Sequence, residues 1–159
     1  MEPAMTLQLE RQAWMATLAK AALGTLEQHV GQLEGIPNYS FLRSPEIGLV
    51  MVRGRAGGNG QAFNLGEMPI ARCAVQLAPS PEREAITGFS YVAGRSRRHA
   101  ELAALCDALL QHPDWHDRVQ AEVVRPLREQ RDRQKGIRDR QTAATKVNFF
   151  TMLRGEVLS

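Results

Sequence analysis

Apolar residues recur at helical spacing at both ends of the chain and follow strand-like patterns in its middle. Near the start, this spacing predicts a helix over residues 6–22 and a second, shorter helix over residues 25–33. Gly35 and Pro37 then end the helical pattern, as a glycine followed by proline commonly does. The apolar faces consist of Leu7, Trp14, Leu18 and Ala21 in the first helix and of Leu26, Val30 and Leu33 in the second.

The middle of the chain carries aromatic and β-branched residues separated by turn sequences. Ser44-Pro45-Glu46 is typical of a turn and predicts two strands where it interrupts the pattern. Short connections throughout predict an antiparallel meander of four to six strands. The predicted strands lie around residues 39–42, 47–53, 62–65, 71–77 and 86–93, and residues 71–77 also allow a short helix through their alanines.

Residues 88–110 give the clearest prediction in the chain, a strand followed directly by a helix. Phe89 to Ala93 predict the strand, and Gly94 ends it. Ser96 is a good helix N-cap because its hydroxyl accepts from a backbone N–H that the first turn leaves unpaired. One apolar stripe then predicts the helix, formed by Leu102, Leu105, Cys106, Leu109 and Leu110.

The C-terminal third is predicted to be helical. His112-Pro113-Asp114-Trp115 marks a helix start, and Pro126 is expected to bend or end that helix. Residues 120–141 are dense in charge, which predicts an exposed helix or a pair of helices around Gly136. The fold class is therefore α+β, with N-terminal helices, an antiparallel sheet and C-terminal helices in a single domain over residues 1–159.

Composition narrows the classes of function. The chain has 159 residues and a formal net charge of +3, with a sequence pI near 9.2. This mild basicity suits anionic ligands but lies far below what nucleic-acid binding demands. The N-terminus lacks the pattern of a signal peptide, and no apolar run approaches the ~20 residues of a membrane span. We therefore expect a cytoplasmic protein with no membrane or nucleic-acid partner.

Two distant cysteines, Cys73 and Cys106, limit redox and metal chemistry. Cys106 lies on an apolar stripe and is predicted to be a small core residue. Structural zinc sites and iron–sulfur clusters require about four soft ligands, so neither is expected on this chain alone. His112 and His116 have the spacing of a metal pair, but no third ligand is evident, and we predict no metal site.

Basic residues crowd the turn before the central helix. Arg95, Arg97, Arg98 and His99 lie where a helix start exposes free N–H groups. One interpretation is ordinary solvation, with Arg97 paired to Glu101 one turn further on. The other is a site for a phosphate group or for the acidic surface of a partner. Both interpretations remain open.

A glycine-rich stretch offers a second candidate site. Gly54, Gly57, Gly58 and Gly60 accompany Arg53 and Arg55. The stretch lacks the G-K-[ST] ending of a phosphate-binding loop, and a strand is predicted after it. A hairpin loop is favoured, while close approach of its backbone to a ligand or a neighbouring chain is the alternative.

No frame for independent catalysis is recognisable. Ser90, Ser96 and His99 are present, but no nucleophile motif surrounds them, so no catalytic residue is predicted. The charged C-terminal helix is interpreted as a solvated face. The apolar chain end differs, because exposed apolar patches usually mark contact surfaces. We expect it to dock onto another subunit rather than close the core; it comprises Val147, Phe149, Phe150, Met152 and Leu153.

Several segments, in their order and spacing, resemble the PhnG family, the small subunit of the bacterial carbon–phosphorus lyase core complex. The resemblance spans about residues 11–155. The segments are Arg11-Gln12-Ala13-Trp14-Met15, Gly48-Leu49-Val50, Arg53-Gly54-Arg55-Ala56-Gly57-Gly58, Gly66-Glu67, Gly88-Phe89-Ser90-Tyr91-Val92-Ala93-Gly94-Arg95, Arg98-His99-Ala100-Glu101, and Val147-Asn148-Phe149-Phe150-Thr151-Met152-Leu153-Arg154-Gly155.

The resemblance implies a function in phosphonate breakdown. With PhnH, PhnI and PhnJ the family forms a large symmetric assembly. With PhnI, PhnH and the accessory PhnL, it forms α-D-ribose 1-methylphosphonate 5-triphosphate from ATP and methylphosphonate, releasing adenine, and PhnJ carries out the later C–P cleavage. The nucleosidase activity is attributed to PhnI and the iron–sulfur cluster to PhnJ. The resemblance therefore implies a supporting subunit of a hetero-oligomer that binds no cofactor by itself. The rival hypothesis is a free-standing basic module that binds nucleotides or RNA.

Overall fold

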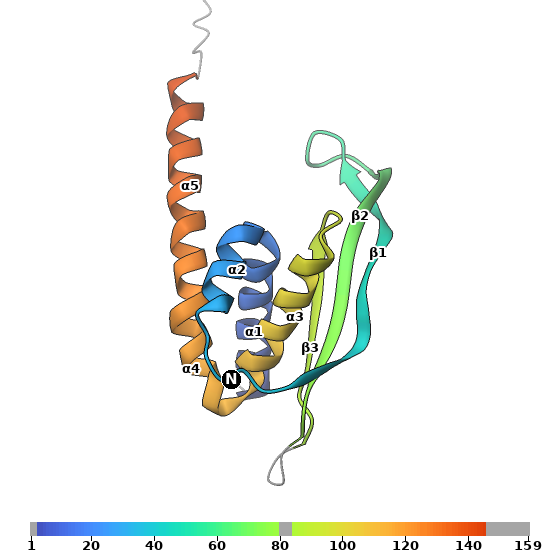
Figure 1. Cartoon of the computed structure of the whole chain (residues 1–159). Coiled ribbons are helices and arrows are strands. Elements are labelled where there is room, and N and C mark those ends of the chain that lie inside the picture. Colours follow the sequence, from blue (N-terminus) through green and yellow to red (C-terminus); the bar gives the residue numbers. More distant parts are fainter. Residues whose placement is uncertain (1–2, 80–83, 146–159) are drawn as a thin grey trace, which may run out of the picture.

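The computed structural model describes residues 3–79 and 84–145 (Figure 1). Helices α1 (Pro3–Lys20) and α2 (Leu23–Gly31) come first, followed by a sheet of three strands and then by further helices. This order confirms the predicted α+β class. The strands are β1 (Tyr39–Arg55), β2 (Ala62–Leu77) and β3 (Thr87–Ala93), and the later helices are α3 (Arg97–Gln111), α4 (Pro113–Val119), the π-helix η1 (Gln120–Val124) and α5 (Arg125–Ala144).

The described sheet is an antiparallel meander, as predicted, but it has three long strands rather than four to six. Ser44-Pro45-Glu46 lies inside β1, where the register with β2 shifts between Arg43 and Glu46. Proline lacks an N–H, and edge strands and irregularities tolerate that loss. The proline therefore marks an irregular edge strand instead of a turn. The segments 62–65 and 71–77 likewise belong to one strand, β2.

Helix α3 packs on the sheet, with α1 and α2 behind it (Figure 1). Close packing of α3 on β3 depends on Gly88, because a Cβ there would overlap the backbone of Ala104 and Ala108. Nearly every residue of α3 is buried, including Cys106, whose predicted place in the core is confirmed. The core thus lies between α3, β2 and β3 on one side and α1, α2 and η1 on the other.

The C-terminal helices decide between the alternatives that the sequence left open. Pro113 begins α4, as expected. Pro126 follows the π-helix and occupies the first turn of α5, so the regular α-helix is interrupted just before it. The wider π turn suits proline, because a regular α-turn would bring its ring against the carbonyl of residue 122. Gly136 does not divide α5, which runs unbroken to Ala144. Beyond Leu127 the helix is exposed, and it projects past α1 and α2 in Figure 1.

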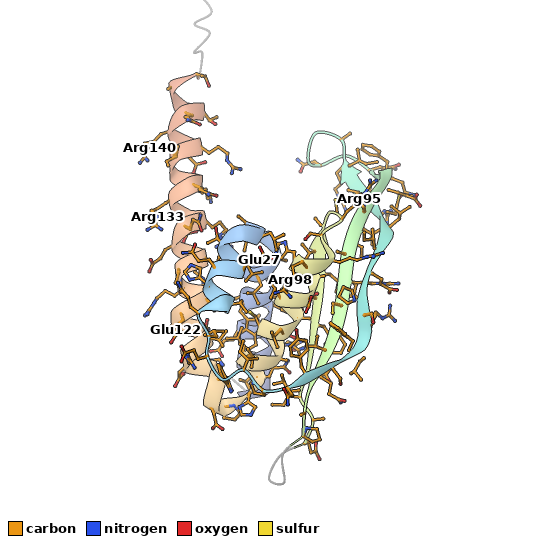
Figure 2. The ribbon with its side chains drawn as sticks, in the orientation of Figure 1. Glu27, Arg95, Arg98, Glu122, Arg133 and Arg140 are labelled. Carbon is orange, nitrogen blue, oxygen red and sulfur yellow. The ribbon has the colours of Figure 1, made fainter. Side chains whose placement is uncertain are left out.

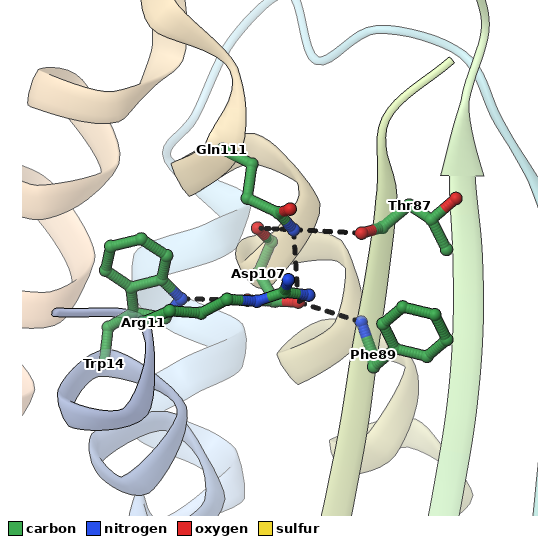
Figure 3. A network of polar contacts seen from close by, with 6 residues as sticks. All are labelled: Arg11, Trp14, Thr87, Phe89, Asp107 and Gln111. Atoms are coloured by element: carbon green, nitrogen blue, oxygen red, sulfur yellow. Dashed lines mark hydrogen bonds and ion pairs between the residues drawn. The ribbon is translucent and has the colours of Figure 1, made fainter. Parts of the chain in front are cut away.

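A buried carboxylate joins α1, α3 and β3 (Figure 3). Asp107 of α3 is fully buried and accepts two hydrogen bonds from Arg11 of α1, at 3.1 and 2.7 Å. It also accepts from the indole Nε1 of Trp14 at 2.9 Å and from the backbone N–H of Phe89 at 2.9 Å. Gln111 donates to the same carboxylate at 3.3 Å and to the carbonyl of Thr87 at 2.9 Å.

The Asp107 network predicts a large loss of stability when its carboxylate is removed. Asp107→Ala leaves the guanidinium of Arg11 and the N–H groups of Trp14 and Phe89 without their acceptor. Breaking a buried ion pair in this way costs about 3–5 kcal/mol of unfolding free energy. Urea unfolding followed by circular dichroism measures it. The matched control is Asp132→Ala, which removes an exposed pair with Arg131 and is expected to cost less than about 1 kcal/mol. Equal losses in the two variants would contradict the assigned role of Asp107.

The two thiols are predicted to be inert in the folded chain. Burial raises the pKa of Cys73 to about 11 and that of Cys106 to about 12. Because the thiolate is the reactive form, an aromatic disulfide reagent at pH 8 should label neither thiol in the native protein and both in urea. Labelling counted by mass spectrometry checks this, and fast modification of either thiol without denaturant would contradict it.

Candidate functional site

The start of α3 has the predicted N-cap, but its basic residues do not converge on one point. The hydroxyl of Ser96 accepts from the backbone N–H of His99 at 3.2 Å. The ring of His99 is buried, and its Nε2 donates to the carbonyl of Leu18 at 2.8 Å. The expectation that His99 faces the same site as the arginines is therefore wrong, because its ring joins α3 to α1. Arg95 and Arg97 are exposed and form no ion pair within the described residues.

Arg98 lies between two carboxylates of the helices, as Figure 2 shows for its Glu27 partner. Its Nη1 lies 3.1 Å from Glu101, and its Nε lies 3.6 Å from Glu27. The sequence suggested Arg97 as the partner of Glu101, but the structure places Arg98 there. Tyr39 also donates to Glu101, at 2.8 Å. Partial burial and this hydrogen bond raise the pKa of Tyr39.

A cleft of about 440 Å³ opens beside Arg98, between α2, α3 and the start of β1. Its lining is both polar and apolar, and its two charged side chains, Arg98 and Glu27, have opposite signs. The cleft therefore carries no excess of positive charge. Arg98 would have to exchange a carboxylate partner before it could bind a phosphate group.

The glycine-rich stretch forms the loop of a β-hairpin between β1 and β2. Gly57 and Gly58 have φ angles of 59° and 81°, which residues other than glycine rarely adopt. The N–H of Gly60 donates to the carbonyl of Ala56 at 2.9 Å, which closes the turn. The loop leads into a strand, whereas a phosphate-binding loop leads into a helix. The hairpin interpretation is confirmed.

The arms of this hairpin hold exposed apolar residues that the sequence analysis did not single out. The side chains of Leu49 and Met51 in β1 are 61% and 50% exposed, and those of Phe63 and Leu65 in β2 are 47% and 62% exposed. The register places Leu49 and Met51 on one face of the hairpin, and Phe63, the partner of Gly54, on the other, so both faces expose apolar side chains. Alternation alone could not reveal this exposure, because it shows which residues share a face and not which face is covered. Exposed apolar side chains of this kind are typical of contact surfaces.

Basic groups surround the same end of the molecule. Arg53 and Arg55 lie where β1 reaches the loop, and they are exposed without an ion pair in the described part of the chain. Figure 2 shows Arg95 toward this end, and Arg133 and Arg140 on the projecting helix. Helix α5 itself carries seven basic and three acidic side chains. The apolar chain end predicted to dock, Val147 to Leu153, lies outside the described residues.

The other candidate residues have structural contacts. His116 Nδ1 lies 2.6 Å from the carbonyl of Leu110, and its ring meets the edge of Trp14. The ring of His112 accepts from the backbone N–H of Asp114 at 3.3 Å. Ser90 is buried and donates to the carbonyl of Ala100 at 2.6 Å. Within residues 3–79 and 84–145, no group of three His, Cys, Asp or Glu could hold a metal ion.

Comparison with known proteins decides the family. The model of the family described as phosphonate metabolism protein PhnG matches residues 9–155. The chain belongs to the PhnG family. A relative from Rhizobium meliloti (strain 1021), the α-D-ribose 1-methylphosphonate 5-triphosphate synthase subunit PhnG, is 40% identical over 149 residues, which cover 92% of this chain and 90% of the relative. The resemblance noted in the sequence is confirmed.

Two residues of the PhnG-like segment near the start have a clear structural role. Arg11 and Trp14 both donate to Asp107 and so fix α1 to the core. This PhnG-family chain has no helix, in its described portion, that is long and apolar enough to cross a membrane.

The contact between Tyr39 and Glu101 predicts a measurable titration. Glu101→Gln removes the negative charge that helps to raise the pKa of Tyr39, so that pKa should fall toward its ordinary value. Ultraviolet titration in a Tyr91→Phe background isolates the Tyr39 signal. The control is Glu67→Gln on β2, which should leave the pKa unchanged. An unaltered Tyr39 titration in Glu101→Gln would contradict the contact.

Proposed function

We propose that this chain is a subunit of an α-D-ribose 1-methylphosphonate 5-triphosphate synthase and acts in phosphonate catabolism. The observation that supports the proposal is its 40% identity, over nearly the whole of both chains, to a protein named as such a subunit. The synthase converts ATP and methylphosphonate to α-D-ribose 1-methylphosphonate 5-triphosphate and adenine. The rival module that binds nucleotides or RNA on its own has no comparable support.

The role of this chain within the synthase is mainly structural. The Ser and His side chains considered for catalysis donate to or accept from the backbone, and two of them are buried. The surfaces that remain open are an apolar hairpin and exposed arginines, which suit contacts with other subunits. A subunit of this kind supports the activity of its partners without contributing a reacting group.

Its partners are PhnH-, PhnI- and PhnJ-type subunits, together with PhnL, in a cytoplasmic hetero-oligomer. ATP and the iron–sulfur cluster belong to those subunits. The described residues of this chain do not fit such a cluster, because its two cysteines are both buried and a cluster takes about four thiolates.

The exposed arginines meet an acidic face of a partner, with PhnI as the first candidate. Arg95, Arg97, Arg53 and Arg55 have no acidic partner in the described part of this chain, whereas Arg98 has two. Arginine side chains bind carboxylates with two parallel hydrogen bonds, which fixes orientation as well as charge. The apolar chain end, Val147 to Leu153, docks onto a subunit as well.

Omission of the chain tests the proposed function directly. PhnH, PhnI, PhnJ and PhnL are produced with and without it, and adenine release from ATP and methylphosphonate is followed by chromatography. We expect adenine from the complete set, none from this chain alone and little from the set that lacks it. Full turnover by the set without the chain would contradict the proposal.

The arginines give this experiment a matched pair of variants. Arg95→Ala combined with Arg97→Ala should weaken assembly on a sizing column, and Arg128→Ala on α5 serves as the control for loss of an exposed cation. Intact assembly with weakened ATP binding would assign the turn to an anion site instead. Tight RNA binding by the chain alone, with a steep dependence on salt, would favour the rival module.

A further inference from the structure

Side chains of α3 bind backbone groups along one edge of the three-stranded sheet. Residues of β3 alternate between facing β2 and facing outward. On the outward side, the N–H of Phe89 donates to Asp107 and the carbonyl of Thr87 accepts from Gln111, each at 2.9 Å. Helix α3 thus binds two of the outward backbone groups of β3 (Figure 3) and lies against this edge, which hinders pairing with a further strand there.

The other edge, β1, is open. Within the described residues β1 pairs with β2 alone, and Figure 1 shows β1 as the outermost element on its side of the molecule. Pro45 and the register shift beside it interrupt the strand near its start. Beyond them, residues 46–52 pair continuously with β2 and present a regular edge.

Hydrogen bonds at the other side of β2 show which β1 groups point outward. The carbonyl of Pro69 accepts from Gly94, at 2.9 Å, so Pro69 faces away from β1. Leu49 is the register partner of Pro69. In an antiparallel ladder, the backbone N–H and C=O groups of two opposite residues either both point toward the other strand or both point away from it. The N–H and carbonyl of Leu49 therefore point to the open side of β1.

The same alternation turns the backbone groups of Ile47 and Met51 outward. These three residues also expose their side chains, at 42% for Ile47, 61% for Leu49 and 50% for Met51. Free backbone donors and acceptors therefore lie beside a row of apolar side chains. A peptide strand that pairs here gains ladder hydrogen bonds and apolar burial together.

We propose that a strand of a partner subunit adds to β1 at residues 46–52 and extends the sheet to four strands. This inference rests on the proposed function, because that function supplies the partner. The added strand carries aliphatic side chains against Ile47, Leu49 and Met51. Carboxylates of the partner, next to the added strand, bind Arg53 and Arg55 at the end of β1.

The charges of β1 favour a strand from a partner subunit over a strand from a second copy of this chain. β1 contains three arginines and a single acid, Glu46, which Arg43 and Arg72 already hold at 2.9 and 2.7 Å. Antiparallel pairing of two β1 strands centred on Leu49 sets Arg43 opposite Arg55. Like charges opposite each other destabilise a strand pair. The 146–159 segment is no better match, since it carries Lys146 and Arg154 against Glu156.

Hydrogen–deuterium exchange of the full-length chain, free and in the assembled synthase, tests the proposal. Peptides covering residues 46–52 should exchange about tenfold more slowly or better in the complex, since their outward amides become paired. Peptides of β3 should change little, because the added strand pairs with β1 at the opposite edge of the sheet.

Three variants separate strand addition from general surface contact. Leu49→Lys combined with Met51→Lys puts charge on the open edge and should weaken assembly about tenfold or more. Leu49→Pro removes an outward N–H that β2 does not use, and should weaken assembly while the chain stays folded by circular dichroism. Ile137→Lys combined with Leu7→Lys is the control, since these residues are similarly exposed, at 48% and 61%, on other elements.

The outcomes distinguish this inference from the proposed function. Slower exchange in residues 46–52 together with loss of assembly in the lysine and proline variants supports it. A complete, active synthase with unchanged exchange at β1 overturns it and leaves the proposed function standing. A free chain that dimerises through β1, and that Leu49→Lys makes monomeric, also overturns it. If no synthase subunit binds the chain, the inference and the proposed function both fail.

Discussion

The hydrogen bonds to the buried carboxylate of Asp107 hold the helices and the sheet together. It receives donors from α1, from β3 and from its own helix, so one side chain fixes three elements that meet in the core. A charge at this depth is tolerated only because Arg11 neutralises it and its oxygens accept well-aligned hydrogen bonds. The helical layer is therefore bound to one margin of the sheet.

The two margins of the sheet therefore differ. At the margin of the sheet beside α3, side chains of α3 bind the N–H of Phe89 and the carbonyl of Thr87, while β1 at the opposite margin pairs with β2 alone within the described residues. The arginines differ in a related way: Arg98 forms ion pairs with two carboxylates, and Arg53, Arg55 and Arg95 are exposed without an ion pair among the described residues. A chain that satisfies its interior and leaves one end apolar and basic has the properties of a subunit, in agreement with its membership of the PhnG family.

Local patterns predicted the parts of the fold that local chemistry controls. Ser96 caps α3 and Pro113 begins α4, because each acts on backbone groups within a few residues. The predicted number of strands was wrong because proline is common both in turns and in edge strands. Only the pairing with the neighbouring strand shows that Pro45 lies in an edge strand. The pairing of Arg11 with Asp107, across 96 positions, has no local signal at all.

The candidate site was predicted in part for the same reason. The glycine loop was correctly interpreted as a hairpin, since φ preferences are local. The direction of the His99 ring depends on where α1 packs, and the exposure of Leu49 depends on which part of β1 the helices cover, so neither could be predicted from spacing. The family resemblance, by contrast, relied on the order of many segments and was correct.

Amide exchange in the free, full-length chain, resolved by residue with NMR, tests the central claim most directly. Phe89 lies on the closed edge and Leu49 on the open edge of one sheet. We expect the Phe89 amide to exchange only through global unfolding, at rates that Asp107→Ala accelerates, and the Leu49 amide to exchange orders of magnitude faster. Equal protection of the two amides, or a Phe89 amide that does not respond to the loss of Asp107, would contradict it.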